Sequence, residues 1–473
     1  MSFTPFLASV AQTLMTRVHP SVTDARSRDA LEACVRAVAG MAAALEVADE
    51  RHVLSLPLPD SATEGTTPLL VTTPPENLAA NDQSAARIAA GAHWLKQGHW
   101  LENTDDRASA LAMLDWELKT LDSKITSITH RLHAGGEDQD DLKSLEIDPL
   151  ALERYFLQRY GAHSGARITN FRQATGGRSR QTAVFNLEGD TGLPYGLVVQ
   201  RDHPASITSF GVESQYPVLE LVSRSKLKTS KPVLLEMDRS VIGAPFLILE
   251  KASGDVAGAD YFAPPQSPAL ALELAEQLAT LHAIDPSPLT DTIRSTVENG
   301  TVKEWRDELD SIEAAWQQLN HAPSMAISAA FAWMRAHIDQ VGAERAIVHN
   351  DAAFHNILIE NGHFSSLLDW ELVHIGHPAE DLGYCRAFVQ EIIEWDEFVD
   401  AYVASGGQRF PAPVVDYFSL RAGIHLLTLL QYGCSKLISG ATSDINLAEV
   451  GTYFIPRHHN RIATMVATVL SRA

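Results

Sequence analysis

The stretch from residue 346 to residue 382, AIVHNDAAFHNILIENGHFSSLLDWELVHIGHPAEDL, constrains the fold of this chain more than any other. At its centre Asn361-Gly362 lies between two apolar runs, and this dipeptide favours a two-residue β-hairpin because both positions tolerate positive φ. Closing the hairpin brings Asn356, before the first strand, close to Asp369, after the second. Asp351 lies upstream of Asn356 on the same loop. The sequence therefore predicts three oxygen-bearing side chains at the mouth of one hairpin.

These side chains suit phosphoryl transfer. Moving a γ-phosphoryl group requires a carboxylate beside the attacking hydroxyl, and Asp351 can serve as that base. It also requires hard oxygen ligands for Mg²⁺, which Asn356, Asp369 and the adjacent Glu371 can supply. His349 precedes the base by two residues and joins the predicted catalytic group, where we expect it to brace the loop rather than react.

The motif His349-x-Asp351-x4-Asn356, followed by Asp369-Trp370-Glu371, resembles the aminoglycoside phosphotransferase and choline kinase superfamily, relatives of the protein kinases. Its extension through residues 377–383, HPAEDLG, is similar to bacterial small-molecule kinases allied to the kinase-like half of acyl-CoA dehydrogenase family proteins. The resemblance implies an α+β, bilobal protein-kinase-like fold with a small β-rich N-lobe and a mainly helical C-lobe. It also implies ATP and Mg²⁺ as cofactors and a small-molecule hydroxyl as the acceptor.

The resemblance extends to nucleotide-binding residues in the N-lobe. Gly176-Gly177 and Ser179 lie between two expected strands and resemble the loop that covers the phosphates, where exposed backbone N–H groups meet phosphate oxygens. Arg201 ends the apolar strand 196–201 and matches the cation that contacts the α- and β-phosphates. Glu250 and Ala252 match the hinge that binds adenine, mostly through backbone groups.

The carboxylate partner of Arg201 is expected on the helix that follows it. The aligned residue there is Gln215, and Glu213 lies two residues away. Either Glu213 pairs with Arg201 or the ion pair is missing, and the sequence leaves both alternatives open. Pro217 predicts that this helix starts late.

Hydrophobic periodicity and composition predict that residues 1–133 form an all-helical N-terminal domain and that residues 134–146 form an acidic linker. The resemblance implies that residues 147–252 form the N-lobe and that residues 253–473 form the C-lobe with the catalytic hairpin and the acceptor site. The helical domain is also the predicted surface for a homodimer or for a protein partner.

The pentapeptide Leu-Asp-Trp-Glu-Leu occurs twice, at residues 114–118 and 368–372. The first copy lies among helix formers, where Asp115 and Glu117 would point about 200° apart around a helix axis and could not share one metal ion. Only the second copy follows the hairpin and the HxD motif. The repeated sequence is therefore expected to have two different structures.

Composition excludes several function classes. The net charge of −22 argues against nucleic-acid binding, which needs a basic face. No apolar run is long enough to span a membrane, and three scattered cysteines predict a reducing cytoplasm. Four histidines between residues 355 and 377 would allow a zinc hydrolase, but they lack metal-ligand spacing.

The predicted function is an ATP- and Mg²⁺-dependent small-molecule kinase. Its leading acceptor is a catabolic alcohol or a hydroxyacyl thioester, by resemblance to the dehydrogenase-linked kinases. An aminoglycoside-type antibiotic phosphotransferase is the alternative within enzymes. A nucleotide-binding pseudokinase or scaffold is the alternative outside them, and the uncertain carboxylate partner of Arg201 favours it.

Overall fold

The computed structural model describes residues 58, 79–101, 104–132, 147–173, 180–202, 211–258, 264–319, 324–438 and 450–472. Gly176, Gly177, Ser179 and the linker at 134–146 lie outside these residues, as do the helices expected before residue 58. The chain divides into two compact units. The two-lobed unit comprises 142–301 and 342–418, and the helical unit comprises 1–141, 302–341 and 419–473.

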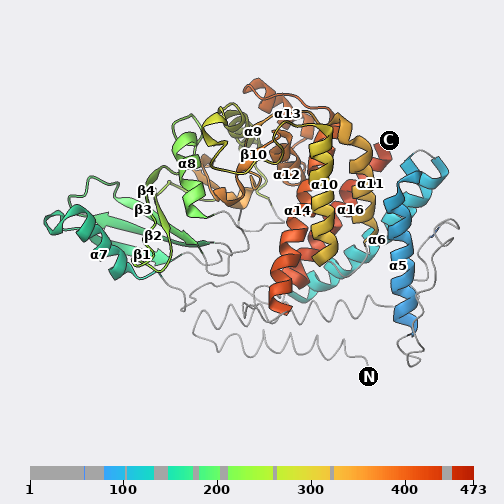
Figure 1. Cartoon of the computed structure of the whole chain (residues 1–473), viewed down its shortest axis with the longest axis horizontal. Coiled ribbons are helices and arrows are strands. Elements are labelled where there is room, and N and C mark those ends of the chain that lie inside the picture. Colours follow the sequence, from blue (N-terminus) through green and yellow to red (C-terminus); the bar gives the residue numbers. More distant parts are fainter. Residues whose placement is uncertain are drawn as a thin grey trace. The chain divides into compact units, whose positions relative to one another are not determined.

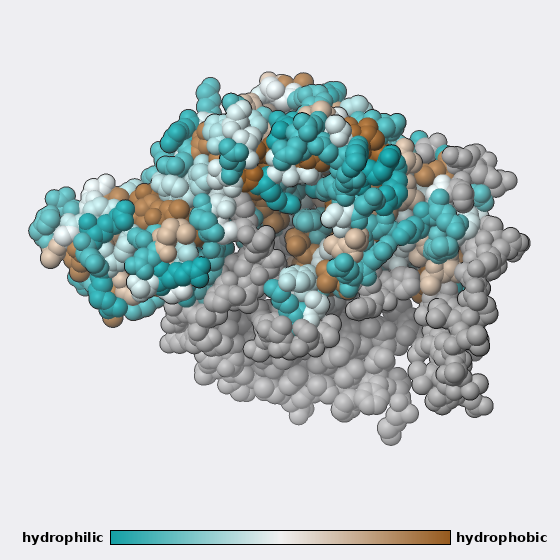
Figure 2. Space-filling model, viewed as in Figure 1, coloured by the Kyte–Doolittle hydropathy of each residue, from teal (hydrophilic) through white to brown (hydrophobic). Residues whose placement is uncertain are grey.

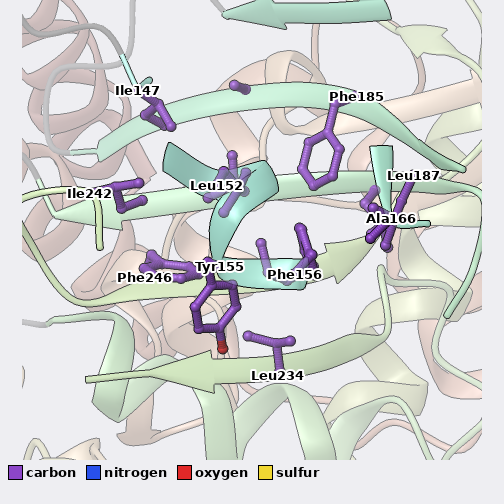
Figure 3. Close-up of a cluster of buried hydrophobic side chains, with 14 residues drawn as sticks. Ile147, Leu152, Tyr155, Phe156, Ala166, Phe185, Leu187, Leu234, Ile242 and Phe246 are labelled. Atoms are coloured by element: carbon purple, nitrogen blue, oxygen red, sulfur yellow. The ribbon is translucent and has the colours of Figure 1, made fainter. Parts of the chain in front are cut away.

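The first lobe of the two-lobed unit is built on an antiparallel sheet of five strands in the order β1-β2-β3-β5-β4. Their bounds are β1 Arg167–Gln173, β2 Arg180–Glu188, β3 Gly196–Asp202, β4 Pro232–Glu236 and β5 Phe246–Glu250. One face packs against helix α7, Pro149–Tyr160, whose Leu152, Tyr155 and Phe156 reach the sheet (Figure 3). Phe185 and Phe246 meet them from β2 and β5. This apolar cluster fixes which face of each strand is turned toward α7.

Helix α8, Val212–Val222, packs on β3, β4 and β5. The prediction that Pro217 delays this helix is wrong, because α8 already includes Pro217 within its length. Asp202 at the end of β3 explains the early start. Its carboxylate accepts the Val212 backbone N–H at 3.2 Å, which satisfies a donor that has no partner inside the helix.

The predicted hairpin is confirmed. Strands β8, Ile357–Glu360, and β9, His363–Leu367, pair in antiparallel fashion, and β6, Asp255–Val256, adds to their edge. Asn361 and Gly362 have φ of 54° and 83°, as a two-residue hairpin turn requires. A second pair, β7 Ala346–Val348 and β10 His374–Gly376, delivers the chain into the loop and receives it afterwards. The loop with its polar side chains is thus held at both ends by strand pairing.

Helices complete the second lobe. They are α9 Pro268–His282, α12 Ala379–Val389, α13 Trp395–Ala404 and the first residues of α14, Ala412–Ile438. Helix α9 packs against α13, β7 and β9, so it supports both strand pairs. Almost every residue of α12 is buried, including Glu380 and Asp381 in its first turn.

The helical unit joins segments from distant parts of the sequence. It contains α5 Ala79–Gln97, α6 Thr104–Leu132, α10 Val302–Leu319, α11 Met325–His337, α16 Ile455–Arg472 and most of α14. Helix α6 packs on α16 and α11, and α5 packs on α11; Figure 1 shows α10, α11 and α16 side by side. Segments assigned by sequence to the N-terminal domain and to the C-lobe therefore share one core. The domain boundaries at 133 and 146 stay a prediction.

The first copy of the repeated pentapeptide lies in α6, and its glutamate caps another helix. The buried Glu117 carboxylate accepts hydrogen bonds from Ser324 Oγ at 3.1 Å and from the backbone N–H groups of Met325 and Ala326 at 3.2 and 2.5 Å. These donors form the start of α11, where unpaired N–H groups and the helix dipole favour a negative charge. Asp115 is exposed and pairs with Lys119 at 2.5 Å.

Large exposed hydrophobic residues are scattered singly, for example Leu150, Tyr195 and Tyr432. On the face shown in Figure 2, hydrophilic residues lie between the hydrophobic ones. Among the described residues no helix has the length and hydropathy of a membrane span. Cys385 and Cys434 are buried.

Candidate active site

Asp351 lies at the centre of a polar cluster at the mouth of the hairpin. Asn356 Nδ2 donates to its Oδ2 at 2.9 Å and to its backbone oxygen at 3.0 Å, and the Tyr384 hydroxyl donates to Oδ1. The side chain keeps partial solvent exposure, whereas Asn356 is buried. Because Asn356 and Tyr384 each donate to an oxygen of the Asp351 carboxylate, they fix its orientation. One side of the carboxylate stays accessible to solvent or to a substrate.

The carboxylates of Asp351 and Asp369 lie close enough for their negative charges to repel each other. Burial, and then the charge of Asp369, raise the pKa of Asp351 well above its usual value. Burial also raises the pKa of Asp369, while the nearby charge of Arg180 acts in the opposite direction. A divalent cation at this site would relieve the repulsion between the two carboxylates.

Asp381 in the first turn of α12 braces the loop that carries Asp351. Its two carboxylate oxygens accept the backbone N–H groups of His349 at 2.9 Å and Asn350 at 2.6 Å, and His282 Nε2 lies 3.0 Å away. Burial alone would raise the pKa of Asp381, but the interactions with His282 and His349 hold it below its usual value. Asp381, the second of the two acidic residues within HPAEDLG, therefore anchors the HxD segment.

The buried His349 side chain connects two parts of the loop. Its Nε2 donates to the Leu368 carbonyl at 2.8 Å, its Nδ1 accepts the Asp351 N–H at 3.2 Å, and its ring meets Trp370 edge-on at 4.8 Å. Burial lowers the pKa of His349 to about 4, so the imidazole is neutral at pH 7. With both nitrogens engaged by the backbone, the ring ties the Asp351 segment to the Asp369 segment.

Two residues of the site adopt left-handed backbone conformations. Asn350 has φ of 59° and Asp369 has φ of 61°. Asn350 follows the end of β7, and Asp369 follows the end of β9. Such conformations cost free energy for residues other than glycine, although Asn and Asp tolerate them best. The strand pairs on either side, together with Asp381, hold the chain in this shape.

The predicted metal ligands Asn356, Asp369 and Glu371 each lie near Asp351. Asn356 donates its amide N–H₂ to Asp351, which leaves the amide oxygen free to act as an acceptor, and the Asp369 carboxylate lies close enough to Asp351 for its charge to raise the pKa of that residue. Glu371 is partly exposed and lies 3.8 Å from Arg180 Nε. Within the described part of the chain, no group of three or more His, Cys, Asp or Glu side chains is arranged as a metal site. Two hard oxygen ligands still suit Mg²⁺, which keeps waters and phosphate oxygens in its remaining positions.

The structure does not bring Arg201 to this cluster. Its Nε donates to Gln181 Oε1 at 2.5 Å and its Nη1 donates to the Ile242 carbonyl, and burial lowers its pKa. On α8, Glu213 is exposed, whereas Gln215 is buried and donates to Gln200 Oε1 at 3.3 Å. The strand and helix that were expected to form an ion pair are joined here by two neutral amides.

Glu250 ends β5, and Ala252 lies in the segment that leads from β5 to β6. Because β6 pairs with β8, this segment connects the five-stranded sheet with the hairpin that carries Asn356. It is therefore placed between the two lobes, where an adenine-binding hinge would lie.

Sequence reasoning did not single out Arg180, Asp381 or Tyr384. Asp381 and Tyr384 are one turn apart on α12, so the helical spacing after HPAE could have drawn attention to both. Arg180 follows the expected glycine loop, but its position opposite Asp202 depends on strand register, which a single sequence does not give.

Comparison with known proteins finds similar sequences and a similar fold. The family model APH, described as the phosphotransferase enzyme family, matches residues 170–421. Acyl-CoA dehydrogenase family member 11 of Mus musculus is 27% identical over 259 residues, which cover 52% of this chain and 31% of that protein. The Homo sapiens protein of that name is 25% identical over 272 residues, 54% of this chain and 33% of the relative. The chain thus spans about a third of the length of these curated relatives.

A solved structure from Ralstonia eutropha, assigned to the aminoglycoside phosphotransferases, covers 69% of this chain and 99% of its own, at 19% identity and a TM-score of 0.53. This likeness confirms the bilobal α+β fold predicted for the two-lobed part.

Proposed function

Because the chain belongs to the phosphotransferase enzyme family, we propose that it transfers the γ-phosphate of ATP, with Mg²⁺, to a hydroxyl group of a small molecule. The observation that carries the proposal is the polar cluster in which Asn356 holds Asp351 at 2.9 Å and Asp369 lies close enough to shift its pKa. A carboxylate held beside two hard oxygen ligands is the arrangement that phosphoryl transfer requires.

Each residue of the cluster has a distinct task in this reaction. Asp351 orients the acceptor hydroxyl and takes its proton late in transfer, while Asn356 and Tyr384 hold the carboxylate in place. Asn356 and Asp369, with Glu371 near them, would hold Mg²⁺, which would offset the negative charge of the phosphates. His349 positions the loop and stays neutral.

The N-lobe would hold the nucleotide. Backbone groups between Glu250 and Ala252 would bind adenine at the connection of the two lobes. The loop with Gly176, Gly177 and Ser179 would cover the phosphates through its N–H groups. ATP in place of GTP, and Mg²⁺ itself, are parts of the proposal.

The leading acceptor class is a catabolic alcohol or a hydroxyacyl thioester. The similarity to acyl-CoA dehydrogenase family member 11 favours it, since the matched third of that protein belongs to a longer chain named for acyl-CoA chemistry. An aminoglycoside is the second candidate, favoured by the fold likeness to the Ralstonia eutropha structure.

The experiment is an acceptor screen that follows ATP consumption with hydroxyacyl-CoAs, simple alcohols and aminoglycosides, with Asp351→Asn as the matched control. Asn keeps the size of Asp351 and removes its charge. We expect turnover to fall ~10²–10⁴-fold in this variant while Mg-ATP affinity is retained. Near-normal turnover in Asp351→Asn would refute the role of this carboxylate. Tight nucleotide binding without turnover on any acceptor would favour the pseudokinase alternative.

A further inference from the structure

The side chains of β3 are divided between the two faces of the five-stranded sheet. Leu197 and Val199 belong to the apolar cluster under α7. Successive strand residues point to opposite faces, and neither pairing of β3 shows a register shift. Arg201 therefore shares the α7 face, where it contacts the carbonyl of Ile242, another member of the cluster.

The opposite face of β3 carries Val198, Gln200 and Asp202. Contacts to α8 identify this face, because Gln200 accepts from Gln215 and Asp202 accepts from Val212. The strand position that faces α8 is thus occupied by a neutral amide, and its helix partner is a neutral amide as well. Neither residue can offset the charge of a phosphate chain.

Arg180 brings a cation to this face from the neighbouring strand. It begins β2 directly opposite Asp202, so both side chains point to the α8 side of the sheet. The residue is only 6% exposed, and its guanidinium lies 3.8 Å from the carboxylates of both Asp202 and Glu371. It therefore reaches from the N-lobe sheet to the segment that carries Asp369, which is where a phosphate chain bound to Mg²⁺ would end.

We propose that Arg180 on β2, rather than a cation on β3, binds the phosphates of the nucleotide in this protein. The proposal rests on the proposed function, because it assigns a residue for the same nucleotide site. Arg180 would donate to phosphate oxygens on the α8 face, and Glu371 and Asp202 would hold its guanidinium in position. A guanidinium is suited to this task because its fork of N–H donors matches phosphate oxygens.

The test compares Arg180→Gln with Arg201→Gln by calorimetry with Mg-ATP, Mg-ADP and adenosine. We expect Arg180→Gln to weaken Mg-ATP binding ~10–100-fold, the effect of losing charge-assisted hydrogen bonds, and to leave adenosine binding unchanged. Arg201→Gln should not change the ratio of Mg-ATP affinity to adenosine affinity. Melting curves establish that each variant is folded.

A relocated charge provides a second test. Gln200 lies on the same face as Arg180, diagonally across the β2–β3 pair. In Arg180→Gln/Gln200→Lys we expect at least a tenfold recovery of Mg-ATP affinity over Arg180→Gln, and Arg180→Lys alone should stay within about tenfold of the unaltered protein. A purely structural role for Arg180 would not predict rescue by a cation on a different strand.

The outcomes separate this inference from the proposed function. If the unaltered protein binds neither Mg-ATP nor Mg-GTP, the proposed function fails and this inference fails with it. If the unaltered protein binds Mg-ATP but only Arg201→Gln loses phosphate-dependent affinity, the kinase assignment stands and the assignment of Arg180 is overturned. The same holds if Gln200→Lys gives no recovery in folded Arg180→Gln.

Discussion

The two copies of Leu-Asp-Trp-Glu-Leu have the same sequence and opposite environments. In α6, the aspartate Asp115 is exposed and the glutamate Glu117 is buried against the start of α11. After β9, the aspartate Asp369 has a left-handed backbone and lies beside Asp351, and the glutamate Glu371 is close to Arg180. The helix separates the two carboxylates around its axis, whereas the loop directs both toward one cluster. The same five residues can therefore contribute to an active site only where the backbone conformation directs their side chains together.

The largest effect should come from the aspartates. Asp369→Asn removes a hard ligand, and loss of several kcal/mol of charge stabilisation corresponds to about 10³-fold or more in turnover. Asp115→Asn, the same change in the first copy, should leave turnover within about twofold, because Asp115 is an exposed helix carboxylate that pairs with Lys119 and belongs to no polar cluster of the candidate site. Turnover and Mg²⁺ dependence of both variants would check this. Equal losses in the two variants would mean that the second copy is no metal site.

The second effect concerns His349, which the second copy holds through Leu368 and Trp370. Its pKa is about 4 in the folded protein and 6.5 in the unfolded chain, so the unfolded state binds more protons between these values. Folding stability should therefore fall as pH drops from 6.5 to about 4, with His349 contributing on the order of 3 kcal/mol. Urea unfolding across this range should show a shallower pH slope for His349→Gln than for the unaltered protein. Parallel slopes would contradict a buried neutral imidazole.

A smaller effect separates the glutamates. Glu117→Gln leaves an acceptor but removes the negative charge at the start of α11, which should cost about 1–2 kcal/mol. Glu371→Gln caps no helix start, and Asp202 still pairs with Arg180 in this variant, so its stability should fall less than that of Glu117→Gln while its Mg-ATP affinity changes through Arg180. Denaturant midpoints and calorimetry would measure the two responses. A stability loss in Glu371→Gln as large as in Glu117→Gln would remove the distinction between a capping and a site glutamate.

The smallest effect belongs to the surface pair of the first copy. Asp115 and Lys119 are exposed and lie four residues apart on one helix, with Lys119 Nζ 2.5 Å from Asp115 Oδ2. Breaking such a pair with Asp115→Ala should cost no more than about 0.5 kcal/mol and should fade at high salt. Thermal unfolding at low and high ionic strength would detect it. A larger, salt-independent loss would indicate that Asp115 has a buried role.

Sequence reasoning succeeded where the structure is local. The hairpin follows from Asn361-Gly362 and two apolar runs, and the spacing around it placed Asp351, Asn356 and Asp369 in one cluster. Sequence reasoning failed where contacts between segments far apart in the sequence determine the role of a residue. Glu117 caps a helix that starts more than 200 residues later in the chain, and no local sequence pattern predicts that contact. Strand register between β2 and β3 likewise decided that Arg180, and not Arg201, faces Glu371.

The helical unit has a consequence for how the chain folds as it is made. Helix α6 ends at residue 132, and its partner α16 begins only at residue 455. At a synthesis rate of 5–20 residues per second, roughly 20–60 s separate the emergence of the two helices from the ribosome. During that interval α6, whose Met113 and Trp116 are buried in the folded protein, lacks α16 as a packing partner. The two-lobed unit needs only residues 142–301 and 342–418, so it can form before α16 is made. Nascent chains should therefore depend on chaperones through the early helices rather than through the catalytic hairpin.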